Sequence, residues 1–318
     1  MIDWMVVTLI FVSGLIAGFA FQRSRLCFVS GLRDLFLFGE TGMTRAILVL
    51  LTAAAAVGPW VVRWRQGFGL TVPFTLGPPL LESLLGGGLF GAGMVLAGSC
   101  AAGAFWRLGE GQGSQLWVLG GMLAGIWGHA ILPAGSGAAT RLALPLWAAP
   151  VALVIVLAGL VVWERERQRH QDGEELMPAL KGRSLHRPWA PETGALVIAL
   201  SLVAFIATTG TTWRLIRPFL FDDVAGALFA LGLIGGGHAA ARFGREWRPR
   251  PAGSWRQRFI RLAGGLLMGY GGRLGWGCTI GALLSGAAVG SAQAWIWLAG
   301  AAAGAWLGTR LLRRLLST

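Results

Sequence analysis

The sequence predicts an all-α integral membrane protein with about nine transmembrane helices, short re-entrant helices and an inverted internal repeat. Its 318 residues are 55% hydrophobic and only 13% charged, with a mean hydropathy of +0.63, whereas soluble domains carry about 25% charged residues. A soluble fold of this size cannot bury so much apolar surface. A disordered chain is excluded as well, because disorder requires low hydrophobicity. The other two observations are apolar stretches of membrane-spanning length and a glycine-rich segment that recurs around two cysteines.

Nine stretches approach the roughly 20 apolar residues that a helix needs to cross the hydrocarbon core. The first is expected to begin at the N-terminus, because residues 1–4 carry none of the basic residues that open a signal peptide. Three further apolar stretches are too short to cross and each begins at or beside a cysteine, so we expect them to be re-entrant: 26–38, 99–108 and 277–289. The nine predicted spans are 4–21, 44–62, 80–97, 115–132, 146–163, 193–209, 222–241, 260–275 and 292–311.

The distribution of arginine and lysine orients these spans. With the N-terminus outside, 21 of the 27 basic residues fall on the inner side of the membrane and six on the outer side, as the positive-inside rule requires. In so apolar a chain the net charge of +13 indicates membrane flanks rather than a surface for nucleic acid. We expect three parts: an N-terminal membrane half (1–163), a cytoplasmic connector (164–192) and a C-terminal membrane half (193–318).

An internal repeat lies around two of the three cysteines. Sliding the chain on itself by 178 residues places Cys100 over Cys278 and matches a unit at 80–132 with a unit at 260–312. Further positions are identical in this register, among them Gln115 with Gln293. Five predicted spans separate the starts of the two units, so the units point in opposite directions through the bilayer. Inverted repeats of this kind place their substrate site near the midplane, at short or glycine-interrupted segments.

The cysteines are the candidate pathway residues. A buried cysteine most often packs as a small apolar side chain, but here each of the three opens a short glycine-flanked segment, which favours a functional role. The topology puts Cys27 and Cys100 on the inner approach and Cys278 on the outer approach. Arg273, five residues before Cys278, either flanks the outer mouth and attracts anions or extends along the membrane surface from the end of its helix.

The glycines around the cysteines divide into two groups. Glycines next to a cysteine fit the close approach of a ligand to the backbone: Gly98, Gly103, Gly277 and Gly281. Glycines about two turns earlier are spaced four residues apart and fit close packing between helices: Gly87, Gly91, Gly265 and Gly269.

Several motifs resemble the YeeE/YedE family of bacterial membrane proteins, thiosulfate transporters of the TsuA type. The matching segments are spread over nearly the whole chain: 23–28 (RSRLCF), 33–38 (RDLFLF), 98–103 (GSCAAG), 109–111 (GEG) and 277–282 (GCTIGA). The resemblance implies an hourglass-shaped fold in the bacterial inner membrane, with a periplasmic N-terminus and a cytoplasmic C-terminus. It further implies that thiosulfate passes along Cys27, Cys100 and Cys278, and that a small cytoplasmic TusA-like sulfur carrier is the partner. Many relatives carry asparagine where this chain has Thr279, which leaves a selenium anion open as the substrate.

The chemistry of thiosulfate suits these residues. Thiosulfate is a dianion with one soft terminal sulfur, and helix N-termini offer it partial positive charge and free N–H groups. Neutral thiols add weak S–H donors and polarizable sulfur. The sequence has no CxxC motif and no Cys/His cluster, so we expect no metal and no cofactor. Three alternatives stay open: a transporter of a selenium or other sulfur anion, a membrane persulfide-transfer enzyme, and a Cu(I) carrier.

Overall fold

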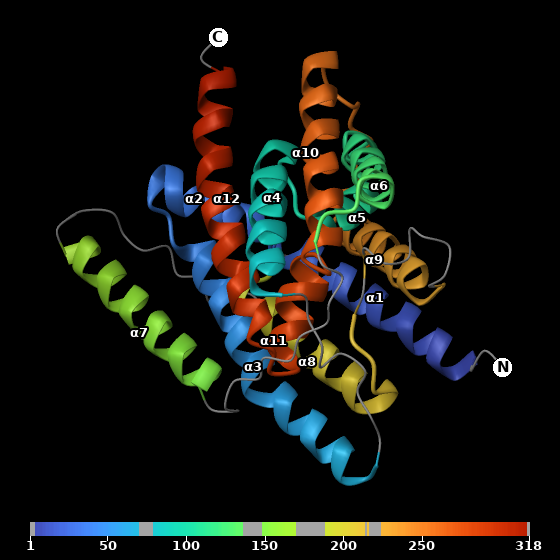
Figure 1. Cartoon of the computed structure of the whole chain (residues 1–318), viewed down its shortest axis with the longest axis vertical. Coiled ribbons are helices and arrows are strands. Elements are labelled where there is room, and N and C mark those ends of the chain that lie inside the picture. Colours follow the sequence, from blue (N-terminus) through green and yellow to red (C-terminus); the bar gives the residue numbers. More distant parts are fainter. Residues whose placement is uncertain are drawn as a thin grey trace.

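The computed structural model describes residues 4–69, 79–135, 148–169, 188–213, 215 and 224–316. These residues form helices joined by short turns (Figure 1), with one isolated bridge between Gln112 and Arg250. The prediction of an all-α membrane protein is confirmed. The elements are α1 (Trp4–Ser24), α2 (Phe28–Phe38), α3 (Gly42–Gly67), α4 (Leu80–Ala97), α5 (Ala101–Gly109), α6 (Gln115–Ile131), α7 (Ala148–Arg169), α8 (Pro191–Thr209), α9 (Val224–Phe243), α10 (Trp255–Leu274), the π-helix η2 (Thr279–Ser285), α11 (Gly286–Ala288) and α12 (Gln293–Leu316).

The long helices fall on the predicted spans, and the short elements fall on the three cysteine-led stretches. Among the described residues, five helical segments are long and apolar enough to cross a membrane, and two of them combine a long helix with the short one that follows: Trp4–Phe38, Gly42–Gly67, Leu80–Gly109, Pro191–Thr209 and Val224–Phe243. Helix α6 has 17 residues, just below this length. The count of nine spans therefore stays a prediction. Most of the predicted connector, at 170–187, and the predicted outer residues Arg141, Arg214 and Arg217 lie outside the described residues.

The helices pair in a reciprocal manner. Helix α1 packs against α9 and α8 against α3, while α4 packs against α12 and α10 against α6. Helices α1 and α8 also contact each other, as do α4 and α10. The pattern is unchanged when each long helix of the block α1–α6 is exchanged with a counterpart in the block α8–α12: α1 with α8, α3 with α9, α4 with α10 and α6 with α12. Helix α7 stands between the two blocks in the chain and packs at the periphery against α3 (Figure 1).

Glycines bring the paired helices into backbone contact. A Cβ added at Gly91 of α4 would come 2.1 Å from the carbonyl oxygen of Ala301 on α12. A Cβ at Gly269 of α10 would come 2.1 Å from the carbonyl oxygen of Met122 on α6. Gly87 and Gly265, one turn earlier, approach the same two partner helices to 2.3 and 2.2 Å. The prediction that these glycines serve close helix packing is confirmed, and we call the two contacts the glycine seams.

Candidate functional site

Each of the three cysteines occupies the same place in a recurring backbone unit. Cys27, Cys100 and Cys278 are the residues immediately before α2, α5 and η2, and all three have extended backbone, with φ of −146°, −82° and −100°. Their side chains are fully buried. A long helix precedes each of them, so every unit consists of a long helix, a sharp turn, the cysteine and a short helix. We call this unit a cysteine joint.

The turn of each joint is made by a residue with left-handed backbone, two positions before the cysteine. These residues are Arg25 (φ 53°), Gly98 (φ 70°) and Trp276 (φ 56°). Glycine adopts this conformation freely, but a residue with a side chain pays about 1–2 kcal/mol. Strain of this size persists where the surrounding structure enforces it, and such places cluster at functional sites. Two of the three joints therefore hold a strained residue so that the next helix begins at the cysteine.

The first two joints converge, on the side that the sequence predicts to be the inner one. A Cβ built at Gly103 would lie 3.4 Å from the Cys100 Sγ and 3.9 Å from the Cys27 Sγ, so both thiols lie next to this position. The Gly103 N–H donates to the Cys100 Sγ at 3.4 Å. Helices α2 and α5 thus begin beside one another, with the partial positive charge of both N-termini at the thiols. Sequence analysis placed Cys27 and Cys100 on one side of the membrane but did not predict that they meet.

Arg107 adds a full positive charge to this inner pair of thiols. Its Nη1 donates to the Gly98 carbonyl at 2.8 Å, and its guanidinium stacks over the Trp106 ring, 5.2 Å from the ring centre. The field of this guanidinium reaches both Cys27 and Cys100. Arg107 was missed as a site residue, because in the sequence it is one of many basic residues on the inner side.

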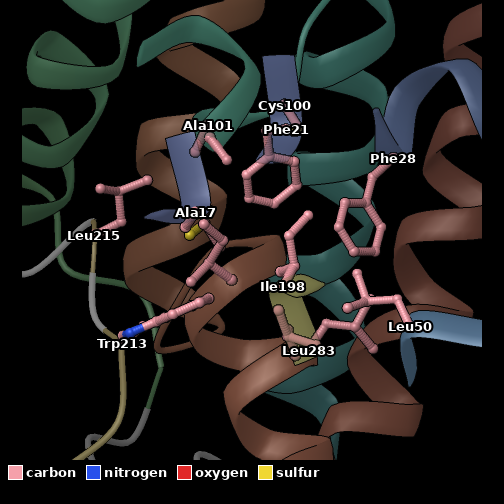
Figure 2. Packing of buried hydrophobic residues seen from close by; sticks show 14 of the residues in the cluster. Ala17, Phe21, Phe28, Leu50, Cys100, Ala101, Ile198, Trp213, Leu215 and Leu283 are labelled. Atoms are coloured by element: carbon pink, nitrogen blue, oxygen red, sulfur yellow. The ribbon is translucent and has the colours of Figure 1, made fainter. Parts of the chain in front are cut away.

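The third joint lies against the segment that precedes α9. Cys278 opens a π-helix, a rare element that often occurs at functional sites. The Ser285 hydroxyl, at the end of that helix, donates to the Trp213 carbonyl at 3.1 Å. A Cβ at Gly281 would meet the same carbonyl oxygen at 3.8 Å. Figure 2 shows the Trp213 ring and Leu283 at one end of the buried cluster, with Cys100 and Phe21 toward the other end.

The four glycines predicted to admit a ligand have different surroundings. Gly98 makes the left-handed turn described above, and a Cβ at Gly277 would lie 2.6 Å from the Ala282 nitrogen, so backbone geometry alone accounts for both. Gly103 and Gly281 are different, because a Cβ there would find only ordinary contacts, at 3.4 and 3.8 Å. Packing therefore leaves room for a methyl group at Gly103 and Gly281, and does not explain why those two positions are glycine.

The arginines near the cysteines differ in their partners. Arg273 lies in the last turn of α10 and is partly buried, which agrees with either sequence-based interpretation. Arg25 is bound within the protein instead of lining an open mouth. Its guanidinium donates to both carboxylate oxygens of Glu110 at 2.9 Å and to Glu246 at 2.7 Å.

These contacts belong to an inner charge cluster, which comprises Arg23, Arg25, Glu110, Glu246 and Arg250. Glu110 is the fully buried C-cap of α5. Arg250 lies 3.8 Å from Glu110, and the buried Arg23 lies 3.7 Å from Glu246. The cluster ties the first joint to the ends of α5 and α9. In the described part of the chain, no group of three His, Cys, Asp or Glu side chains could hold a metal ion.

Known proteins resemble this chain over most of its length. A family model described as sulphur transport matches residues 23–307. A protein named thiosulfate transporter TsuA from Escherichia coli K12 is 28% identical, over 95% of this chain and 93% of that protein. A protein of the same name from Spirochaeta thermophila is 26% identical, over 89% and 93%. The probable transporter YedE of Escherichia coli is 36% identical over 101 residues, which cover 32% of this chain and 24% of that protein.

These comparisons confirm the resemblance drawn from the cysteine-containing motifs. They also confirm the interpretation of the chain as a transporter rather than an enzyme. With the family model covering nearly the whole sequence, the chain belongs to the sulphur transport family.

Proposed function

We propose that the chain takes up thiosulfate across the bacterial inner membrane, along a pathway formed by its cysteine joints. The single observation that carries the proposal is the recurrence of the joint: each cysteine lies fully buried at the start of a short helix, two residues after a left-handed turn. Three stretches of the chain, two of them matched by the internal repeat, arrive at the same geometry. The names of the two relatives aligned over most of this chain support thiosulfate as the anion.

The joints attract a dianion but bind it weakly enough for release. At the inner pair, two helix N-termini and the Arg107 guanidinium supply positive potential, and the thiols supply weak donors and polarizable sulfur. Neutral thiols bind an anion weakly compared with a guanidinium, and transport requires binding that is weak enough for release. The Arg107 guanidinium donates to the Gly98 carbonyl, so in this proposal it does not bind the anion directly. In this proposal Arg107 sets the potential and the thiols make the contact.

The direction of transport follows from the proposed topology. With the N-terminus periplasmic and the C-terminus cytoplasmic, thiosulfate meets Cys278 and Arg273 first, in the second repeat unit, and then passes Cys100 and Cys27. Gly103 and Gly281, where packing leaves room for a methyl group, give the anion access to the thiols on each side. A small TusA-like carrier protein in the cytoplasm would receive the sulfur. The halves 1–163 and 193–318 then form the two sides of one transport unit, joined by the connector at 164–192.

Uptake of radiolabelled thiosulfate by bacteria that lack their own sulfur-anion transporters tests this proposal. We expect Cys100→Ala and Cys278→Ala to stop uptake while the protein stays inserted and monodisperse, because the change removes a thiol and little volume. Ser13→Ala is the matched control, since Ser13 is buried and its hydroxyl bonds only to the Ile10 carbonyl of its own helix. Near-normal uptake by both cysteine variants would refute the pathway. Competition with selenite and sulfate measures the selectivity, and recovery of intact double-labelled thiosulfate excludes sulfur transfer.

A further inference from the structure

The long helix and the left-handed turn of a joint recur at the end of α8, where threonine stands in the place of cysteine. Helix α8 ends at Thr209, Gly210 follows with left-handed backbone (φ 71°), and Thr212 stands two positions later. Cys27, Cys100 and Cys278 have this same relation to Arg25, Gly98 and Trp276. We propose that Thr212 is the fourth substrate-contacting residue of the pathway, and that its hydroxyl donates a hydrogen bond to an oxygen of the sulfur anion on the outer side. This inference rests on the proposed function.

The reciprocal pairing of the helices identifies Thr212 as the counterpart of Cys27. Helix α8 packs against α3 just as α1 packs against α9, and α1 and α8 contact each other. The exchange that carries α4 onto α10 therefore carries α1 onto α8. The end of α1, with Arg25 and Cys27, is carried onto the end of α8, with Gly210 and Thr212. Cys100 and Cys278 already form the other pair of counterparts.

The local contacts agree with this exchange. On the inner side, Gly103 lies three residues after Cys100, and its Cβ position lies 3.9 Å from the Cys27 Sγ. On the outer side, Gly281 lies three residues after Cys278, and its Cβ position lies 3.8 Å from the carbonyl oxygen of Trp213, the residue after Thr212. The bond from Ser285 to that carbonyl fixes the segment against η2. Thr212 thus stands next to the Cys278 joint, as Cys27 stands next to the Cys100 joint.

The Thr212 hydroxyl has no acceptor in the part of the chain that the structure describes. The residue is 5% exposed, and its Oγ1 has no hydrogen-bond partner among the described residues. Buried hydroxyls are nearly always bonded. The buried Thr309 follows this rule, because its hydroxyl donates to the Trp306 carbonyl of its own helix at 2.7 Å, whereas the Thr279 hydroxyl, like that of Thr212, has no partner among the described residues. Thr212 stands beyond the end of α8 and makes no such bond to a described residue, so its hydroxyl can donate to a bound anion.

A hydroxyl and a thiol favour different ends of the anion. An O–H group is the stronger donor and suits a charged oxygen, whereas a thiol is a weak donor with a polarizable sulfur. Thr212 and Cys278 then form an outer pair of one hydroxyl and one thiol, beside the Thr279 hydroxyl, which also has no partner among the described residues, while the inner side has two thiols. An anion with both oxygen and sulfur ends fits the outer pair, so this pair would orient thiosulfate as it enters.

The test compares three variants in the uptake assay, with the KM for thiosulfate as the measured quantity. Thr212→Val removes the hydroxyl and keeps the shape, and a lost hydrogen bond to a charged group predicts a rise in KM of about tenfold or more. Thr212→Ser keeps the hydroxyl and should keep the KM. Thr309→Val is the control, because it removes an equally buried hydroxyl that is bonded within α12. A KM for Thr212→Val equal to that of Thr309→Val would overturn the inference, as would a rise in KM for Thr212→Ser equal to that for Thr212→Val.

The outcomes separate this inference from the proposed function. If Cys278→Ala stops uptake while Thr212→Val transports normally, the fourth contact is wrong and the cysteine pathway stands. If both cysteine variants transport normally, the pathway itself is wrong. Should Thr212→Val fail to insert into the membrane, Thr212→Ala is compared with Thr309→Ala. A higher KM for Thr212→Ala supports the fourth contact, and equal KM values refute it.

Discussion

Replacing Gly103 or Gly281 by alanine should reduce thiosulfate uptake without reducing the stability of the protein. At Gly103 the new Cβ would lie 3.4 Å from the Cys100 Sγ, and at Gly281 its nearest neighbour would be 3.8 Å away. Both are ordinary van der Waals contacts, so overpacking costs nothing, and alanine gains up to about 1 kcal/mol in helix propensity over glycine. The methyl group would, however, occupy the space in front of the thiols that the proposal gives to the anion.

Replacing a glycine of the glycine seams by alanine should have the opposite effect on stability and lower it. An alanine at Gly91 or Gly269 would place its Cβ 2.1 Å from a carbonyl oxygen, whereas real contacts of this kind stay beyond 3.0 Å. The helices would have to separate by about 1 Å, and overpacking of this size costs about 1–3 kcal/mol. Gly88→Ala is the neutral control, because its Cβ would have only one neighbour, at 3.7 Å.

Two measurements distinguish the groups: the midpoint of thermal unfolding in detergent and the KM for thiosulfate in cells. We expect the Gly103 and Gly281 variants to unfold at or above the wild-type temperature, with a KM raised about tenfold by the loss of one contact to a charged group. The seam variants should unfold at lower temperatures. Wild-type uptake by both Gly103→Ala and Gly281→Ala would refute the reasoning, because it would mean that the space beside the thiols is not used.

Three further predictions concern charge and topology. Glu110→Ala should lower the free energy of unfolding by about 1–3 kcal/mol, less than for a fully buried pair because Arg25 is 41% exposed; an unchanged unfolding temperature would contradict this. Arg107→Ala should raise the KM for thiosulfate and make it less sensitive to salt, because a positive charge near the thiols is lost and the Gly98 carbonyl loses its donor. A KM and a salt dependence equal to those of the wild-type protein would show that Arg107 does not belong to the site. A periplasmic reporter fused after Thr318 should be inactive, and an active one would reverse the proposed orientation.

The elements that sequence analysis predicted well depend on local information. Hydropathy over some 20 residues predicts α4 at the bounds the structure gives, 80–97, and the short stretches beginning at 99 and 277 predict the starts of α5 and η2 to within two residues. Spacing of four between Gly87 and Gly91 is enough to predict a packed face. All these signals lie within one helix or one turn.

Features that sequence analysis missed depend on residues far apart or on unusual backbone. Arg25 pairs with Glu110 and Glu246, which lie 85 and 221 residues away, and no local pattern indicates such partners. The left-handed turns at Arg25 and Trp276 occur at residues that seldom adopt this conformation, so only Gly98 could have been predicted. Thr212 shares no side-chain type with the three cysteines, and a search for cysteines passes over it.

The glycine seams also limit how the protein can move. Where two backbones touch, a helix cannot rotate about its axis without bringing a side chain into the space that glycine leaves open, and packed interfaces resist continuous deformation. Helices α4 and α12, and likewise α10 and α6, therefore move as rigid pairs. Movement that admits and releases an anion is then left to the short elements α2, α5 and η2, and to the turns at the joints. We therefore expect a transporter built this way to open by small local displacements at the joints, while the helix pairs joined by the glycine seams keep their packing.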